Sequence, residues 1–226
     1  MYKKLLVVAA CLAMATPLFA QNKEDERIGK AATVLQELLT TDNLPKHILD
    51  QADCVLIFPS VKKVAIGIGG SYGRGVLVCR KGDNMDGAWS APGMYALDQG
   101  SLGIQLGSTA TDFVLVVMRK NGVDQILNGK TKLGGNAAAA AGPTGAQAQG
   151  YNAASMTADV LTYSRTKGVF AGVSLEGATM DTDSDANKKV YGKSVPTKVI
   201  ITTEPVPAAG KGLVDLLDKT SPKKHS

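Results

Sequence analysis

The side chains that most often carry out acid–base and nucleophilic chemistry are scarce in this chain of 226 residues. There are two histidines, His47 and His225, and His225 lies in a polar tail, so any Ser–His or Cys–His pair would depend on His47. The sequence contains no GxSxG nucleophile elbow and no HExxH zinc helix. We therefore expect neither an enzyme nor a cofactor, and the one alternative left open is a carboxylate pair that the fold assembles in space.

Three aspartates begin like a calcium-binding loop. Asp181, Asp183 and Asp185 have the spacing of the first ligands, but position six is Ala186 and position twelve is Gly192. A calcium loop needs glycine at position six and a bidentate glutamate at position twelve. The sequence therefore predicts a helix cap rather than a metal site.

The cysteines also lack metal-ligand spacing. Cys54 and Cys79 each lie in an apolar stretch that has the character of a strand, and no histidine stands at zinc-finger distance from them. Two interpretations remain open: a Cys54–Cys79 disulfide, which an oxidising compartment would preserve, or two buried thiols that act as small apolar side chains.

The first twenty residues have the pattern of a secretory signal. Lys3 and Lys4 precede an apolar run over residues 5–15, and small residues lead up to Ala20. We expect cleavage after Ala20 and a periplasmic or secreted protein that associates with membranes. Lipidation at Cys11 is the less favoured alternative, because few apolar residues separate Lys4 from Cys11.

The charge of the chain is mildly basic. The formal net charge is +5, and it falls to +3 when the expected signal is removed, because that segment carries Lys3 and Lys4 but no acid. A small positive charge suits an anionic lipid surface and is too low for a typical nucleic-acid-binding domain. We therefore expect no nucleic acid among the partners.

A glycine-rich stretch over residues 64–80 predicts a β-hairpin. Bulky and small residues alternate through its first half, and glycines then surround Ser71 and Tyr72 before a second apolar run. No Gly-Lys-Ser/Thr follows, so residues 70–75 are predicted to be a turn rather than a phosphate loop. Residues 101–107 repeat the alternation. We expect one bulky sheet face in the core and one small face that either receives a helix or leaves a shallow apolar groove.

The remaining elements follow from periodicity and from turn residues. Helices are expected over 23–39, 45–51, 181–191 and 208–218, and strands over 54–58, 113–118, 160–163, 169–175 and 198–203, with a turn at 119–122. The alanine-rich segment 133–150 is either a helix or a small-residue strand with a loop. The predicted fold class is α+β, a single domain with a mainly antiparallel, barrel-like sheet and flanking N- and C-terminal helices. Its expected range is 21–203, followed by a C-terminal helix and basic tail over 204–226.

Seven stretches of the chain occur in an order that resembles one known family. They are VLIFP at 55–59, GGSYGRGVLV at 69–78, WSAP at 89–92, GIQLG at 103–107, TDFVLV at 111–116, GPTG at 142–145 and YSRTKGVFAGVSLEG at 163–177. Each stretch alone is weak, but together they resemble the SYLF domain over about residues 30–192. The C-terminal helix and the tail lie outside that resemblance.

The resemblance implies a non-catalytic domain that binds phospholipid. Eukaryotic members of the SYLF family bind phosphoinositides and actin. An exported chain would not meet actin, so we carry over only the lipid binding and expect no actin partner. The second hypothesis is a structural or protein-interaction module of the cell envelope that has no lipid ligand.

Basic residues in or beside the matching stretches are the candidate lipid-binding groups. Their cationic side chains, at or near strand ends beside an apolar groove, could hold a headgroup phosphate, and arginine could do so through two hydrogen bonds. The alternative for each is ordinary solvated surface charge. The candidates are Lys62, Lys63, Arg74, Arg80, Arg165 and Lys167.

Overall fold

The computed structural model describes residues 23–64, 70–99, 110–144, 157–166, 168–173 and 175–222. Its strands form one sheet in the order β5-β9-β3-β2-β1-β4-β7-β6, with β8 paired to β7. The strands are β1 (Cys54–Val64), β2 (Gly70–Cys79), β3 (Gly93–Gln99), β4 (Thr111–Val117), β5 (Thr131–Lys132), β6 (Ala139–Ala141), β7 (Val160–Thr166), β8 (Val169–Gly172) and β9 (Thr179–Thr182). All of these pairings are antiparallel except β6 with β7.

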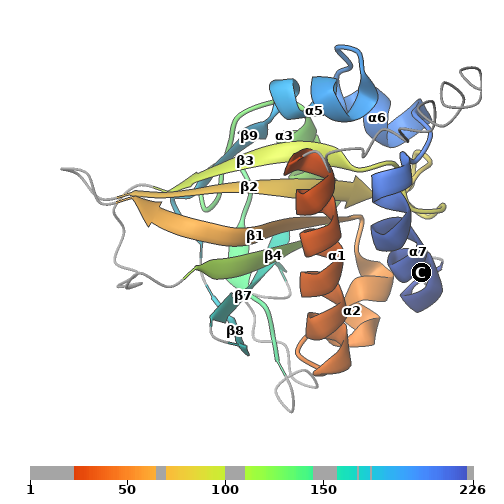
Figure 1. Cartoon of the computed structure of the whole chain (residues 1–226). Coiled ribbons are helices and arrows are strands. Elements are labelled where there is room, and N and C mark those ends of the chain that lie inside the picture. The colour runs from red at the N-terminus through yellow and green to blue at the C-terminus, as the bar shows by residue number, and fades with distance from the viewer. Residues whose placement is uncertain are drawn as a thin grey trace, which may run out of the picture.

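One face of the sheet is covered by helices from both ends of the chain (Figure 1). The helices in the described ranges are α1 (Lys23–Thr40), α2 (Lys46–Gln51), α3 (Lys120–Leu127), α5 (Ser184–Tyr191), α6 (Thr197–Thr203) and α7 (Lys211–Thr220), with a 3₁₀ turn at Ala208–Gly210. On this first face, Ile57 and Val76 of the sheet pack in one cluster with Leu35 of α1, Leu49 of α2 and Leu217 of α7. The terminal helices therefore belong to the core of the domain.

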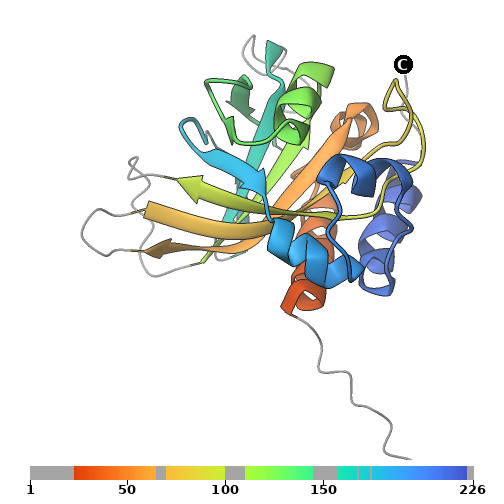
Figure 2. The same ribbon diagram turned by 90° about the horizontal axis from the view of Figure 1, so that it is seen from above.

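The other face of the sheet is also buried. Phe58, Leu77 and Leu115 project to this second face and pack in a cluster that includes Ile126 of α3 and Ile201 of α6. The sheet curls, with α3 on one side and α1 and α7 on the other (Figure 2). Burial on both faces explains why β1 and β4 are continuous apolar runs rather than alternating ones.

The glycine-rich stretch differs from its prediction. Residues 70–75 are not a turn, because β2 begins at Gly70 and runs without interruption through them. A Cβ atom on Gly75 would lie 2.4 Å from Cδ1 of Phe58, and one on Gly73 would lie 2.6 Å from Cγ2 of Val61. The glycines in this part of the sheet therefore make room for side chains of the neighbouring strand β1. The small face was expected either to receive a helix or to leave a groove, and at Gly73 and Gly75 these β1 side chains fill it instead. Residues 65–69 and the predicted strand 101–107 lie outside the described residues.

Two other predicted elements have the wrong type. Residues 198–203 form helix α6 rather than a strand, although they are rich in β-branched side chains. Pro196 precedes this helix, and Ile200 and Ile201 are buried on its inner side, so tertiary packing outweighs local propensity. The predicted turn at 119–122 contains the start of α3, and Gly122 there packs closely on Val117 and Asp159.

The fold class and most elements are confirmed. The molecule is a single α+β domain, and the helices predicted at 23–39, 45–51, 181–191 and 208–218 all occur with slightly shifted ends. The alanine-rich segment contains the short strand β6, and its residues 145–150 lie outside the described residues, as does the expected signal at 1–20. Within the described ranges, no helix is long and apolar enough to cross a membrane.

Candidate functional site: a basic cleft beside the first helix

A surface cleft of about 500 Å³ lies between the first two turns of α1 and the strands β1 and β2. We call it the basic cleft, because five of its ten lining residues are lysine or arginine and one is acidic. Its lining residues are Lys23, Glu26, Arg27, Lys30, Pro59, Ser60, Lys62, Tyr72, Gly73 and Arg74. Lys62 and Arg74 are therefore the predicted binding residues that the fold brings together.

Helical spacing brings three of the cations to the cleft. Lys23, Arg27 and Lys30 are four and three residues apart, so they share one side of α1. The opposite side of the helix is anchored in the core by Ile28 and Leu35, which are fully buried. Lys30 also forms a salt bridge of 2.6 Å with Glu26, but both side chains are more than half exposed and such pairs are weak.

The strands supply the other wall of the cleft. The pairing of β1 with β2 is irregular between Ile57 and Lys62, and Ser60 in this bulge has a positive φ of 55°. A hydrogen bond of 2.7 Å, which the Ser60 amide donates to Oδ1 of Asp112, stabilises the bulge. On β2, the guanidinium of Arg74 lies 5.2 Å from the centre of the Tyr72 ring.

A buried carboxylate lies behind the two arginines of the cleft. Asp183, with a side chain 4% exposed, forms a salt bridge with Nη1 of Arg74, and its Oδ2 lies 3.9 Å from Nη1 of Arg27. Its other oxygen caps α5 by accepting a hydrogen bond from the Ala186 amide. The hydrogen bond to Asp183 raises the pKa of Arg74, whereas burial lowers the pKa of Arg27. Both arginines stay charged at neutral pH, because a guanidinium is not deprotonated in proteins.

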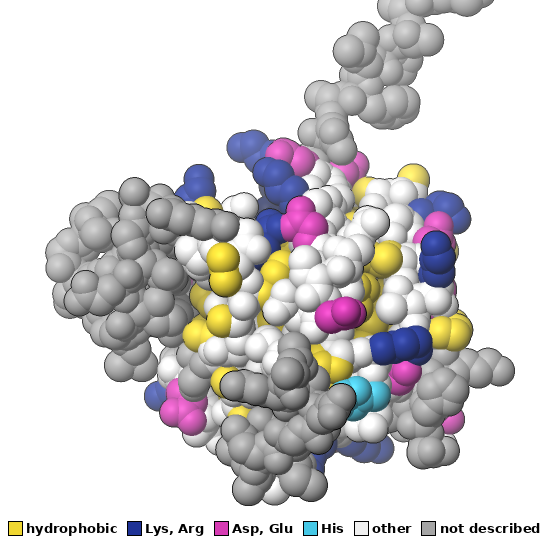
Figure 3. Space-filling model, turned by 90° about the horizontal axis from the view of Figure 1, so that it is seen from below, with side chains coloured by type: hydrophobic (Ala, Val, Ile, Leu, Met, Phe, Trp, Pro, Cys, Tyr) yellow, Lys and Arg dark blue, Asp and Glu magenta, His cyan; other side chains and the backbone are white. Residues whose placement is uncertain are grey.

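The space-filling view from below shows lysine and arginine side chains gathered at the top of the image, with acidic side chains among them (Figure 3). This mixture matches the composition of α1, whose first turn contains Glu24, Asp25 and Glu26. Glu24 is itself buried, does not line the basic cleft, and pairs with Lys189 at 3.1 Å.

Arg80 does not belong to the basic cleft. It is 1% exposed, and its guanidinium donates hydrogen bonds to the carbonyl of Ala52 and to both oxygens of Ser221. It also lies 4.3 Å from the centre of the Trp89 ring. The prediction of a headgroup-binding role for Arg80 is therefore corrected, because this side chain joins parts of the interior and does not reach the surface.

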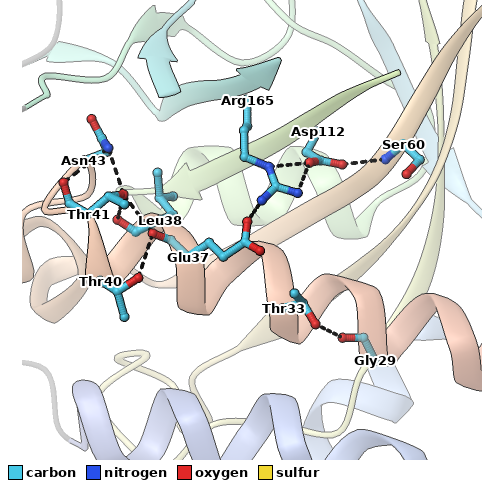
Figure 4. Close-up of polar contacts among 10 residues, drawn as sticks. All are labelled: Gly29, Thr33, Glu37, Leu38, Thr40, Thr41, Asn43, Ser60, Asp112 and Arg165. Carbon is cyan, nitrogen blue, oxygen red and sulfur yellow. Dashed lines mark hydrogen bonds and ion pairs between the residues drawn. The ribbon is translucent and has the colours of Figure 1, made fainter. Parts of the chain in front are cut away.

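Arg165 also lies elsewhere, in a network that spans three strands and one helix (Figure 4). Its Nε donates a hydrogen bond of 2.7 Å to Oδ2 of Asp112, and its Nη1 pairs with Glu37 of α1. Two carboxylates therefore already engage its donors. Lys167 and the side chain of Lys63 lie outside the described residues.

The other predicted sites have structural roles. Cys54 and Cys79 face each other across β1 and β2 and form a disulfide. Asp183 is the cap of α5, as the sequence indicates, and within the described ranges no group of three His, Cys, Asp or Glu side chains could hold a metal ion. His47 is exposed on α2, and His225 lies outside the described residues.

Eight of the ten lining residues were missing from the prediction, and those that supply cations or an exposed ring are Lys23, Arg27, Lys30 and Tyr72. The first three carry a signal in the sequence, since their spacing gives one basic side to a helix whose apolar side was recognised. Tyr72 could not be found in this way, because it depends on residues 70–75 being a strand instead of a turn. Its 37% exposure makes it one of the few exposed large hydrophobic side chains in the described part of the chain.

The fold and the site define an α+β domain with a basic surface cleft and a core that is apolar on both faces of one sheet. The chain belongs to the Ysc84, or SYLF, family: residues 98–220 match the family model described as "Las17-binding protein actin regulator". That range includes α7, which packs against α1 in the same core, so the match extends past the resemblance seen in the motifs.

Relatives match over most of this chain. An SH3 domain-containing protein of Schizosaccharomyces pombe is 34% identical over 205 residues, which are 87% of this chain and 47% of the relative. Protein YSC84 of Saccharomyces cerevisiae is 34% identical over 200 residues, or 84% and 42%. The human SH3 domain-containing YSC84-like protein 1 is 30% identical over 219 residues, or 93% and 62%. The chain spans about half the length of these relatives, and none of the three is named as an enzyme.

These comparisons correct the expectation about partners. The sequence argument set actin aside because the chain is predicted to be exported. The family model, however, is described as an actin regulator that binds Las17, and a yeast relative is named LAS seventeen-binding protein 3. Excluding actin-related partners was therefore wrong: the family description points toward them.

Proposed function

We propose that this chain is a non-catalytic domain that binds an anionic phospholipid surface through the basic cleft. The observation that carries the proposal is the convergence of five cations from α1, β1 and β2 on one cleft, next to the partly exposed ring of Tyr72. A cation near an anionic lipid surface contributes about 1 kcal/mol to binding. An aromatic ring with a polar tip suits the boundary between headgroups and acyl chains.

The test compares two triple variants of equal net charge. One replaces Lys23, Lys30 and Lys62 with glutamine in the cleft. The other, the control, replaces Lys132, Lys198 and Lys219 with glutamine, and these three lysines are exposed on other elements. Co-sedimentation with phosphatidylglycerol vesicles measures binding, with phosphatidylcholine vesicles as the neutral reference. We expect the cleft variant to lose about 10- to 100-fold in affinity and the control to stay near the wild type. Equal losses, or no binding by the wild type, would contradict the proposal.

An actin-regulatory protein partner is the second candidate function. It is favoured by the description of the family as a Las17-binding actin regulator. Co-sedimentation of the purified chain with filamentous actin, in the absence of lipid, distinguishes the two candidates. Binding to filaments without binding to vesicles would favour this second function.

We also propose that residues 1–20 direct export and that the domain functions outside the cytoplasm. The support is the signal-like pattern together with the Cys54–Cys79 disulfide, since disulfides persist mainly in oxidising compartments. Mass spectrometry of the protein purified from its own cells measures the N-terminus. A chain that begins at Gln21 supports export, and an intact Met1 on a cytoplasmic protein would contradict it.

A further inference from the structure

Arg27 has an unusual environment among the cleft residues. Its Nη1 atom is buried and has no hydrogen-bond partner among the described residues, although the side chain as a whole is 17% exposed and lines the basic cleft. The nearest carboxylate oxygen, Oδ2 of Asp183, lies 3.9 Å away, which permits an ion pair but is too long for a hydrogen bond. A buried donor without a partner is destabilising, because it has lost its hydrogen bonds with water.

The surroundings of Arg27 explain why the protein does not satisfy this donor internally. Asp183 is the acid within reach, and it is already engaged by Arg74 and by the cap of α5. The other acid that lines the cleft, Glu26, pairs with Lys30. Each of these acids therefore has another partner, as does Glu24, which pairs with Lys189, and the remaining charges that line the cleft are positive.

We propose that Arg27 is the directional oxyanion-binding group of the basic cleft, donating hydrogen bonds from its guanidinium to a phosphate oxygen. This inference rests on the proposed function and deepens it, because it assigns a defined phosphate subsite instead of diffuse attraction between charges. A guanidinium presents its donors in a rigid fork that matches a phosphate, whereas an ammonium acts as a point charge. The Arg27 side chain lines the basic cleft and is 17% exposed, so a phosphate in the cleft can approach it.

The phosphate can come from two sources, a lipid headgroup or free phosphate, and both offer the same oxygens. A matched pair of variants distinguishes directional hydrogen bonding by Arg27 from diffuse electrostatic attraction by all the cations of the cleft. Arg27→Lys keeps the charge but removes the fork, and Lys30→Gln removes a charge one turn further along the same side of α1. Diffuse attraction predicts that Lys30→Gln is the weaker binder. The proposed subsite predicts the reverse order.

The experiment measures both sources on the full chain. Vesicles of phosphatidylglycerol test the headgroup, and NMR titration with inorganic phosphate, followed at the arginine Nε–Hε resonances, tests the free ion. We expect Arg27→Lys to lose 5- to 20-fold in vesicle affinity, Lys30→Gln to lose less than threefold, and phosphate to shift the Arg27 resonance before that of Arg165. Thermal unfolding of Arg27→Lys and of Lys30→Gln verifies that both variants are folded.

The outcomes separate the subsite from the wider function. If Arg27→Lys binds vesicles as tightly as the wild type while the triple cleft variant does not bind them, the assignment of the subsite is wrong and the proposed function stands. If neither the wild type nor any variant binds vesicles, but phosphate still shifts the Arg27 resonance, the assignment of the subsite stands and the membrane function is wrong. If neither vesicles nor phosphate binds the wild type, both are overturned.

Discussion

At the scale of single residues, the partners of a cation decide what it can bind. Arg74 and Arg165 occur in similar glycine-containing motifs and were equal candidates in the sequence. Arg74 lines a cleft and is 43% exposed, whereas Arg165 is 21% exposed and is held between Asp112 and Glu37. A guanidinium whose donors already engage two carboxylates has few left for an external phosphate.

The first prediction concerns Arg165. Replacing it with glutamine leaves the Asp112 carboxylate, 11% exposed, with the Ser60 amide as its remaining hydrogen-bond partner within this network (Figure 4). We expect the free energy of unfolding to fall by about 1–3 kcal/mol, because charge-assisted hydrogen bonds are lost. Urea denaturation measures this change, with Lys132→Gln as an exposed control. Vesicle affinity should stay within about twofold of the wild type. A tenfold loss of vesicle affinity in a stably folded variant would show that Arg165 contributes to lipid binding.

At the scale of elements, the glycines of β2 fit one strand against another. The ring of Phe58 occupies the space that a side chain at position 75 would need, and the backbone oxygen of Ile57 lies 2.5 Å from the same point. Gly29 in α1 is the opposite case, since no atom of the described residues lies within 4 Å of the Cβ that alanine would add there.

The second prediction contrasts these two glycines. We expect Gly75→Ala to lower the free energy of unfolding by about 1–3 kcal/mol, because Phe58 and the β1 backbone must move. We expect Gly29→Ala to raise it by about 0.5–1 kcal/mol, because alanine favours the helix. Chemical denaturation of both variants measures the difference. If Gly75→Ala were neutral, the space beside β2 would be open, which is one of the two alternatives that the sequence leaves for the small face.

The same elements explain what could and could not be predicted from the sequence. The apolar runs of β1 and β4 and the amphipathic pattern of α1 are local signals, so these elements were predicted correctly. The helix α6 was missed because its β-branched residues favour a strand, and only the packing of Ile200 and Ile201 makes the helix favourable. The basic cleft joins residues 23–30 to residues 59–74, and no local pattern indicates that contact.

At the scale of the whole molecule, the first and last described helices pack together in the core of one domain. Helix α7 packs beside α1, and Ser221 at its end accepts hydrogen bonds from Arg80 and from Nε1 of Trp89. The Ser221 hydroxyl also lies 3.3 Å from the carbonyl oxygen of Leu49 in α2. The last described turns of the chain are thus held against elements more than 130 positions earlier, which agrees with a family match that continues to residue 220.

The third prediction tests this packing through Arg80. Replacing it with lysine keeps the charge but removes the fork that reaches Ala52 and Ser221, and the ammonium cannot satisfy all of these carbonyls. We expect a loss of about 2–4 kcal/mol in the free energy of unfolding, since a buried charge is left with fewer partners. Trp89 is the only tryptophan in the sequence, so its fluorescence reports directly on the contact with Ser221. Lys81→Arg, at the next position, is the control. If Arg80→Lys unfolded with the wild-type midpoint and unchanged Trp89 emission, the C-terminal helix would be held without this anchor, and the deep burial of Arg80 would need another explanation.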